Sequence, residues 1–286
     1  MITFSALTHT GRVREHNEDC YSADPELGLW LVADGIGGHA RGEVASDIVK
    51  ETIGREFAEH HNLQLAIENA HLAVLSEIDR RHDAANMGAT VVALVLSESH
   101  YQIAWVGDSR AYLWDKELEQ LSSDHTYVAS LVENGVISKE EALRHPERNV
   151  ITQSIGVSRE MKLSVSTITG RLHDGQQLLL CSDGLSDEIS DSEIALELRR
   201  NSHPEGQVNA LLKAALKAGG KDNITIMVLG KNVQNKTPDT TPDIDSTLDI
   251  SEESRRQPAK TNNSKLIWIG GSCLALAALA AWVLKL

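Results

Sequence analysis

The 286-residue sequence predicts an α+β fold, in which antiparallel sheets pack together and are covered by helices. The first observation is that apolar residues gather in short runs bounded by glycine and aspartate, a pattern typical of buried strands. The second is that the helical patterns occur in pairs and the strand patterns in groups. Strict alternation of strand and helix would favour a parallel sheet, so this grouping favours antiparallel sheets.

The spacing of apolar residues predicts each element in turn. A helix is expected over 43–59, where Val44, Ala45 and Ile48 share one face, and a second helix over 63–78 has the same spacing. The later elements are strands at 90–96, 101–106, 111–114, 161–168 and 177–181, helices at 191–200 and 204–218, and a closing strand at 224–229.

The stretch from Asp124 to Gly156 differs from the rest of this domain. It is polar and irregular, with short helical patterns at 127–134 and 138–143. We therefore interpret it as an insertion that lies over the functional site and contributes little to the core.

Acidic residues stand where the apolar runs end. Asp34, Asp108 and Asp183 each follow such a run, and Asp222 precedes one. Strands would carry these carboxylates from the core to its edge, where they would repel one another and resist desolvation unless a cation lay among them. A divalent metal site with oxygen ligands is the simplest solution.

Composition excludes some functions. The chain has 41 Asp and Glu against 27 Lys and Arg, a formal net charge of -14, which argues against nucleic-acid binding. Cys20, Cys181 and Cys273 are odd in number and form no disulfide framework, so a reducing compartment is expected. Cys20 and Cys181 are interpreted as packing residues, because no motif makes either a nucleophile. The N-terminal residues lack the pattern of a signal peptide.

The C-terminal segment predicts a membrane anchor. Residues 266–284 carry no charge, and Trp268 and Trp282 stand near the two ends, where interfacial aromatics are favoured. A helix of this length spans roughly 28 Å, close to the thickness of the hydrocarbon layer. The alternative is a buried core helix.

A polar segment separates this anchor from the rest of the chain. Residues 231–264 are rich in Asp, Thr, Ser, Asn and Pro and bury too little apolar surface to fold alone. The sequence thus predicts a globular domain over 1–230, a disordered linker over 231–264 and a single transmembrane helix over 265–286. Basic residues on the linker side predict that the domain faces the cytoplasm.

Short motifs occur along the domain in a fixed order. They are Val13-Arg14-x-x-Asn17-Glu18-Asp19, Asp34-Gly35-x-Gly37-Gly38-His39, Gly107-Asp108-Ser109-Arg110, Ser182-Asp183-Gly184 and Asp222-Asn223. An arginine offers a planar fork that matches a phosphate. Together the motifs resemble the metal-dependent protein serine/threonine phosphatases of the 2C type, in their bacterial form, over residues 1 to about 230.

The resemblance implies a four-layer α-β-β-α sandwich, with two central antiparallel sheets flanked by helix pairs, and two Mg²⁺ or Mn²⁺ ions with a third, weaker ion. Transferred position by position, the resemblance assigns Asp34 as the ligand that bridges the two ions. Glu18 and the Gly35 carbonyl would complete the first ion, Asp183 and Asp222 would hold the second, and Asp108 with Asp183 would hold the third. Asp19 would orient metal-bound water, and Arg14 would bind the substrate phosphate. The insertion at 124–156 corresponds to the mobile flap of the bacterial relatives.

The implied reaction hydrolyses phosphoserine and phosphothreonine in proteins, through direct attack on phosphorus by a water or hydroxide that bridges the ions. Animal members carry a histidine just after the Asp-Gly pair, where this chain has Ile36. His39 is a candidate substitute that would protonate the leaving group, and its alternative role is a hydrogen bond within the turn. His125 and His145 in the flap are more remote candidates.

The resemblance further implies phosphorylated protein substrates and a cognate bacterial serine/threonine kinase, and the anchor implies a lipid bilayer at the cytoplasmic membrane. Two alternatives remain open at this point. One is a silent relative that binds phosphoproteins, which would normally have lost a metal carboxylate. The other is a hydrolase of small phosphate esters or nucleotides.

Overall fold

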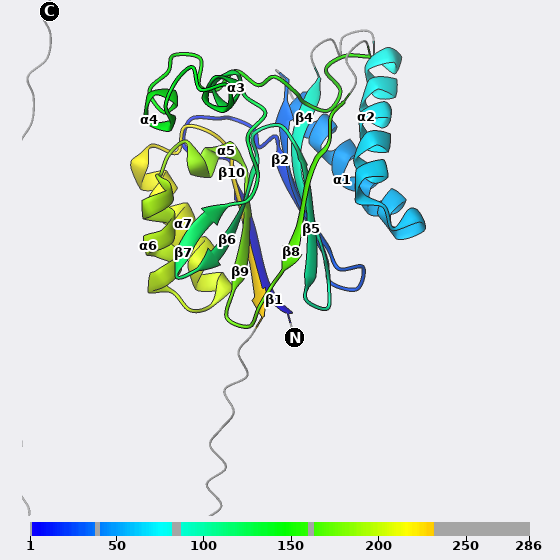
Figure 1. Cartoon of the computed structure of the whole chain (residues 1–286). Coiled ribbons are helices and arrows are strands. Elements are labelled where there is room, and N and C mark those ends of the chain that lie inside the picture. Colours follow the sequence, from blue (N-terminus) through cyan, green and yellow to red (C-terminus); the bar gives the residue numbers. More distant parts are fainter. Residues whose placement is uncertain (1, 38–40, 82–86, 160–162, 232–286) are drawn as a thin grey trace, which may run out of the picture. The chain divides into compact units, whose positions relative to one another are not determined.

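The computed structural model describes residues 2–37, 41–81, 87–159 and 163–231 (Figure 1). Contacts within the chain group Met1–Asn235 as one compact unit. The predicted linker and transmembrane helix lie outside the described residues. Within the described ranges, no helix is long and apolar enough to cross a membrane.

Two antiparallel sheets of five strands form the centre of the domain. The first sheet has the spatial order β1-β10-β9-β6-β7. Its strands are β1 (Ile2–His9), β6 (Arg110–Asp115), β7 (Glu117–Gln120), β9 (Gln177–Cys181) and β10 (Ile224–Lys231). The terminal strands β1 and β10 pair along their whole length, which ties the start of the domain to its end.

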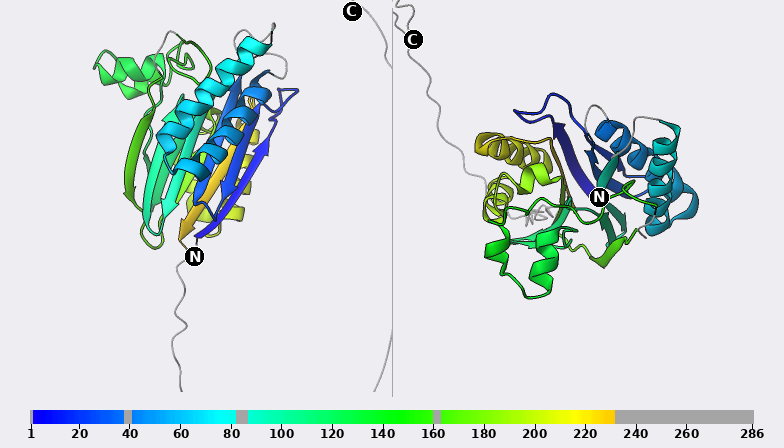
Figure 2. Two further views of the ribbon diagram at one scale, coloured as in Figure 1. Left: turned by 90° about the vertical axis from the view of Figure 1, so that its right-hand side faces the viewer. Right: turned by 90° about the horizontal axis from the view of Figure 1, so that it is seen from above.

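The second sheet has the order β2-β3-β4-β5-β8. Its strands are β2 (Asp19–Asp24), β3 (Leu29–Ile36), β4 (Gly88–Ser97), β5 (His100–Val106) and β8 (Ser166–Arg171). The central strands β3 and β4 are buried along almost their whole length, because helices cover one face and the first sheet covers the other. Figure 2 shows this layering from two further directions.

Helix pairs cover the outer faces of the sheets, as the sequence predicts. Helices α1 (Arg41–His60) and α2 (Leu63–Arg80) lie on the second sheet, and α6 (Asp191–Arg200) and α7 (Pro204–Ala218) lie on the first (Figure 1). Three apolar clusters fill the spaces between the four layers. Fully buried Ile53, Leu94 and Leu211 represent the three clusters, and burial of such side chains is the main stabilising term.

The predicted strand over 161–168 was placed too early. Strand β8 begins at Ser166, and Leu163 and Val165 instead pack as irregular chain against the cluster beneath α1 and α2. Their alternation therefore reflects burial without strand pairing. Strands β1, β2 and β7 were not predicted, because they lie at or near sheet edges and carry many polar residues.

The insertion contains two short helices, α3 (Tyr127–Glu133) and α4 (Lys139–Ala142), which lie above the sheets in Figure 1. Thr126 caps α3, and Ser138 caps α4 through a capping box with Glu141. These local signals explain why both helices could be predicted from the sequence.

The cysteines occupy the packing positions expected for them. Cys20 is partly buried and Cys181 is buried, and burial raises the pKa of both thiols to about 12. A thiol with so high a pKa is a poor nucleophile at neutral pH. Cys273 lies outside the described residues.

Candidate metal and phosphate site

Carboxylates from distant parts of the chain converge at one end of the two sheets. Asp34 near the end of β3 is the register partner of Asp19 at the start of β2. Burial raises the pKa of Asp34 well above its usual value, and the charges of Asp19, Asp183, Asp108 and Asp222 raise it further. The structure therefore brings together the four strand-end aspartates and Asp19.

A chain of hydroxyl groups holds Asp19 in place. Its Oδ2 accepts hydrogen bonds from Ser182 Oγ and Thr225 Oγ1, both at 2.8 Å. Thr225 Oγ1 lies 2.7 Å from Thr8 Oγ1, on the partner strand of the same sheet. Burial still raises the pKa of Asp19 to about 6, because two hydroxyl donors only partly replace water. The carboxylate is thus fixed across both sheets.

Asn223 fastens the N-terminal loop to the start of β10. Its Oδ1 accepts the Glu18 amide N–H at 2.7 Å, and its Nδ2 donates to the carbonyl oxygens of Thr10 and His16, both at 2.9 Å. These bonds place Glu18 and Arg14 beside Asp222. The sequence motif contained Asn223, but its role as the anchor of a loop more than 200 positions away was not predicted.

Arg14 lies at the edge of the cluster, beside Asp222. Its Nη2 lies 2.7 Å from Asp222 Oδ2, while half of its side chain is exposed at 51%. A guanidinium that is anchored at one edge and open to solvent at the other can bind a second anion. Arg14 and Asp222 therefore border the face of the cluster that a phosphate would approach.

Two glycines bring Glu18 close to the end of β3. The Gly35 amide N–H donates to the Glu18 carbonyl oxygen at 3.1 Å. A Cβ on Gly35 would lie 2.1 Å from the Gly42 carbonyl oxygen, and a Cβ on Gly42 would lie 2.7 Å from Glu18 Cδ. Only glycine fits at either position. Gly42 was not predicted, although a glycine in the first turn of a helix was a usable signal.

Several carboxylate oxygens in the cluster have no partner among the residues that the structure describes. Oδ1 of Asp19, Asp108 and Asp183 is buried and accepts no hydrogen bond. Burial also raises the pKa of Asp108 to about 7 and that of Asp183 well above its usual value. Buried, unpartnered carboxylate oxygens are costly unless a cation binds them, so the residues present fit the divalent ions that the sequence implies.

Among the described residues, no three His, Cys, Asp or Glu side chains lie close enough together to hold a metal ion by themselves. An ion at this cluster would therefore need other ligands as well, and Mg²⁺ usually keeps several waters.

The histidine candidates separate into distinct cases. His39 lies outside the described residues. His125 Nδ1 accepts the Gly107 amide N–H at 3.2 Å, its Nε2 lies 2.9 Å from Ser166 Oγ, and burial lowers its pKa. Both nitrogens of the neutral His125 ring therefore have partners within the protein, which indicates a structural role. His145 Nδ1 accepts the Glu147 amide N–H at 3.2 Å within the flap.

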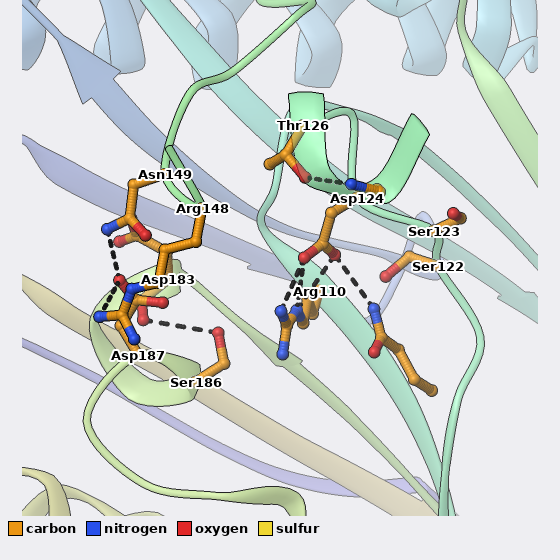
Figure 3. Close-up of polar contacts among 12 residues, drawn as sticks. Arg110, Ser122, Ser123, Asp124, Thr126, Arg148, Asn149, Asp183, Ser186 and Asp187 are labelled. Atoms are coloured by element: carbon orange, nitrogen blue, oxygen red, sulfur yellow. Dashed lines mark hydrogen bonds and ion pairs between the residues drawn. The ribbon is translucent and has the colours of Figure 1, made fainter. Parts of the chain in front are cut away.

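Two polar anchors hold the flap beside the cluster (Figure 3). At its beginning, Nε and Nη2 of Arg110 donate hydrogen bonds to the two carboxylate oxygens of Asp124, at 2.7 to 3.0 Å. At its end, Asn149 Nδ2 donates to Asp187 Oδ2 at 2.6 Å, and Arg148 lies 3.7 Å from the same oxygen. Asp187 caps the short helix α5 (Asp183–Ser186), so the flap is fastened to the element that presents Asp183.

Comparisons with known proteins agree with this architecture. The family model described as protein phosphatase 2C matches residues 9–218, which ends before Asp222. The serine/threonine phosphatase stp of Listeria innocua is 34% identical over 246 residues, covering 81% of this chain and 97% of that protein.

Solved structures give the same result. The Mycobacterium tuberculosis serine/threonine phosphatase PstP matches with a TM-score of 0.74 and 32% identity, covering 81% of this chain and 99% of that one. A PstP catalytic domain in complex with 2 manganese ions matches with a TM-score of 0.70 and 32% identity, covering 80% and 97% of the two chains.

A pH-dependent stability follows from the burial of Asp108. Its folded-state pKa of about 7 lies above its ordinary value of 3.8, so the folded protein keeps a proton that the unfolded chain releases. The free energy of unfolding therefore falls as the pH rises from the ordinary pKa of 3.8 through the folded-state pKa of about 7. We expect metal-free Asp108→Asn protein to be more stable than wild type, by a margin that grows by about 1–3 kcal/mol from pH 5 to pH 8.

Thermal unfolding in EDTA at both pH values measures this margin, with Asp174→Asn as the control at an exposed carboxylate. Addition of Mn²⁺ at pH 8 should reverse the order, because the wild type gains more from the ion. A margin that stays constant or shrinks toward pH 8 contradicts the assignment.

The anchor of the flap can be tested separately. Asn149→Ala removes the bond to Asp187, and we expect backbone amides of residues 127–150 to exchange hydrogen about 2- to 10-fold faster, as one lost hydrogen bond implies. Asn134→Ala is the matched control, because the Asn134 side chain bonds only within its own helix end. Equal exchange in the two variants would show that Asn149 does not hold the flap.

Proposed function

From the premise that this chain belongs to the protein phosphatase 2C family of metal-dependent serine/threonine phosphatases, we propose that it hydrolyses phosphoserine and phosphothreonine in proteins at the carboxylate cluster. The observation that carries the proposal is the set of buried carboxylate oxygens without partners in Asp19, Asp108 and Asp183. Buried carboxylate oxygens of this kind are stabilised when a cation binds them.

The proposed ligand set is the one that the resemblance to the family implies. Asp34, Glu18 and the Gly35 carbonyl would hold one ion, Asp34, Asp183 and Asp222 would hold the second, and Asp108 with Asp183 would hold a third. When bound, the ions would lower the pKa of water enough for it to attack phosphorus at neutral pH and would offset charge on the phosphate oxygens.

The side chains of this protein have their own tasks in the reaction. Arg14 would bind the phosphate oxygens through its exposed edge, which fixes the phosphorus against the cluster. Asp19, fixed by Ser182 and Thr225, would accept a hydrogen bond from water at its free Oδ1 and so orient that water. His39 remains the candidate that protonates the departing serine or threonine oxygen.

The alternatives are less well supported. A silent phosphoprotein-binding relative would not need a full set of metal carboxylates, and every carboxylate of the motifs is present here. A hydrolase of small phosphate esters would turn over an aryl phosphate in preference to a peptide. As the source of the substrate we propose an opposing serine/threonine kinase, which the family implies.

We expect the full-length protein to hydrolyse an aryl phosphate and a phosphothreonine peptide with Mn²⁺, and to lose both activities in EDTA. Asp34→Asn and Asp183→Asn should each lower kcat at least about 100-fold, because each removes an ion ligand. Asp174→Asn is the control, since its carboxylate is exposed. Activity that persists in EDTA, or wild-type activity in the Asp34→Asn protein, would refute the metal mechanism.

We also propose that residues 265–286 anchor the protein in the cytoplasmic membrane as a single-pass helix, with residues 231–264 as its tether and the catalytic domain in the cytoplasm. The uncharged stretch of 266–284 and the basic residues before it support this proposal. Protease added outside intact cells should leave the domain uncut, while the same protease in lysed cells should release it from the membrane fraction. Cleavage in intact cells would reverse the orientation.

A further inference from the structure

A basic groove lies on helix α7 beside the proposed site. It has a volume of about 660 Å³ and is lined by Arg12, Asn209, Leu212, Lys213, Leu216, Lys217 and Gly219. The helical residues follow the three- and four-residue spacing of one helix face. No Asp or Glu lines this groove, although the chain has a net charge of -14.

The cations of the groove have no carboxylate partners. Among the residues that the structure describes, Arg12, Lys213 and Lys217 form no ion pair, and both lysines are exposed. The nearby carboxylate of Glu188 accepts the Lys221 amide N–H at 3.0 Å, and its other oxygen lies against Gly219 at one end of the groove, where a Cβ on Gly219 would be 2.6 Å from it. A cluster of unpaired cations attracts an anionic ligand and repels a cationic one.

The groove and the proposed site share one loop. The Arg12 amide N–H donates to the Gly220 carbonyl oxygen at 2.7 Å, and Arg12 Nε donates to the Leu216 carbonyl oxygen at 2.8 Å. These bonds hold Arg12 at the edge of the groove, and Arg14, two positions later, pairs with Asp222. The same loop therefore presents one cation to the groove and another to the phosphate.

The backbone sets the distance between the two places. Gly219 lines the groove and Asp222 belongs to the cluster, so their Cα atoms are at most about 11 Å apart across three peptide units. The chain is tight here, because a Cβ on Gly11 would lie 2.1 Å from the Asp222 carbonyl oxygen. An extended peptide covers that distance in about three to five residues.

We propose that this groove is a subsite for acidic residues three to five positions from the phosphorylated residue of a protein substrate. The proposal rests on the proposed function of the neighbouring cluster. Lys213 and Lys217 attract the acidic side chains, Arg12 adds a third charge at the edge nearer the cluster, and Leu212 with Leu216 receives the apolar parts of the peptide.

Kinetics with paired substrates test the proposal. Two phosphothreonine peptides are compared, one with Asp and Glu at the third to fifth positions on either side and one with Ser and Gly there. We expect the double variant Lys213→Glu/Lys217→Glu of the full-length protein to raise KM for the acidic peptide about five- to thirtyfold. Hydrolysis of the neutral peptide and of an aryl phosphate should stay within about twofold of wild type, and the difference should shrink at high salt.

Lys116→Glu/Lys231→Glu is the matched control, because it makes the same change of charge at two residues that line a different hollow, at the end of β10 remote from Asp222. It should leave the preference for the acidic peptide unchanged. An equal loss in this control, or an equal loss for acidic and neutral peptides, would show that net charge acts at long range and would overturn the subsite.

A binding measurement separates this proposal from the catalytic one. A fluorescent peptide with the acidic residues but no phosphate should bind the wild type in EDTA more tightly than the double variant, whether or not the protein is a phosphatase. Equal binding overturns the subsite. Binding that is confined to phosphatidylglycerol vesicles, and is lost in the double variant, would also overturn it and would assign the groove to a membrane surface.

Discussion

The concentration of buried negative charge at one end of the sheets is the constraint on which the rest of the structure depends. Asp19 and Asp108 are almost fully buried, and Asp34 and Asp183 lie beside them with raised pKa values. Among the described residues, the ion pair to this group of carboxylates joins Arg14 to Asp222, and the charge of Arg110, which pairs with Asp124, also acts on Asp108. A fold that holds carboxylates in such a place must combine rigid support with a cation from outside the chain.

The support comes from the pairing of the first and last strands of the domain. Strands β1 and β10 form one ladder, and the Thr8–Thr225 pair within it connects to Asp19 on the other sheet. Ser182 at the end of β9 supplies the second hydroxyl. The cluster is therefore positioned where both sheets meet, and Asp19 is fixed by residues that are themselves part of a strand or its end. Such support limits the movement that repulsion would otherwise cause.

Two other parts of the molecule lie beside this cluster. The loop that carries Arg12 and Arg14 connects the edge of the cluster at Asp222 to the basic groove on α7, on the side of the first sheet. The flap approaches the cluster from the segment between β7 and β8, and Asn149 bonds to Asp187. In the function that we propose, the residues that bind the phosphate are therefore separate from those that bind the rest of a peptide.

The sequence by itself determined the α+β class, the paired helices, most strands and the identity of the acidic residues, because these follow from local periodicity and from motifs that are contiguous in the chain. It did not determine the edge strands β1, β2 and β7, whose stability comes from pairing with distant partners. It also did not reveal Gly42, the Asn223 anchor or the Asn149–Asp187 bond, each of which joins residues that are far apart or fits one backbone against another. Only the tertiary structure decided which carboxylate oxygens lack partners, because that depends on which hydroxyl and amide groups the folding of the whole chain brings within reach.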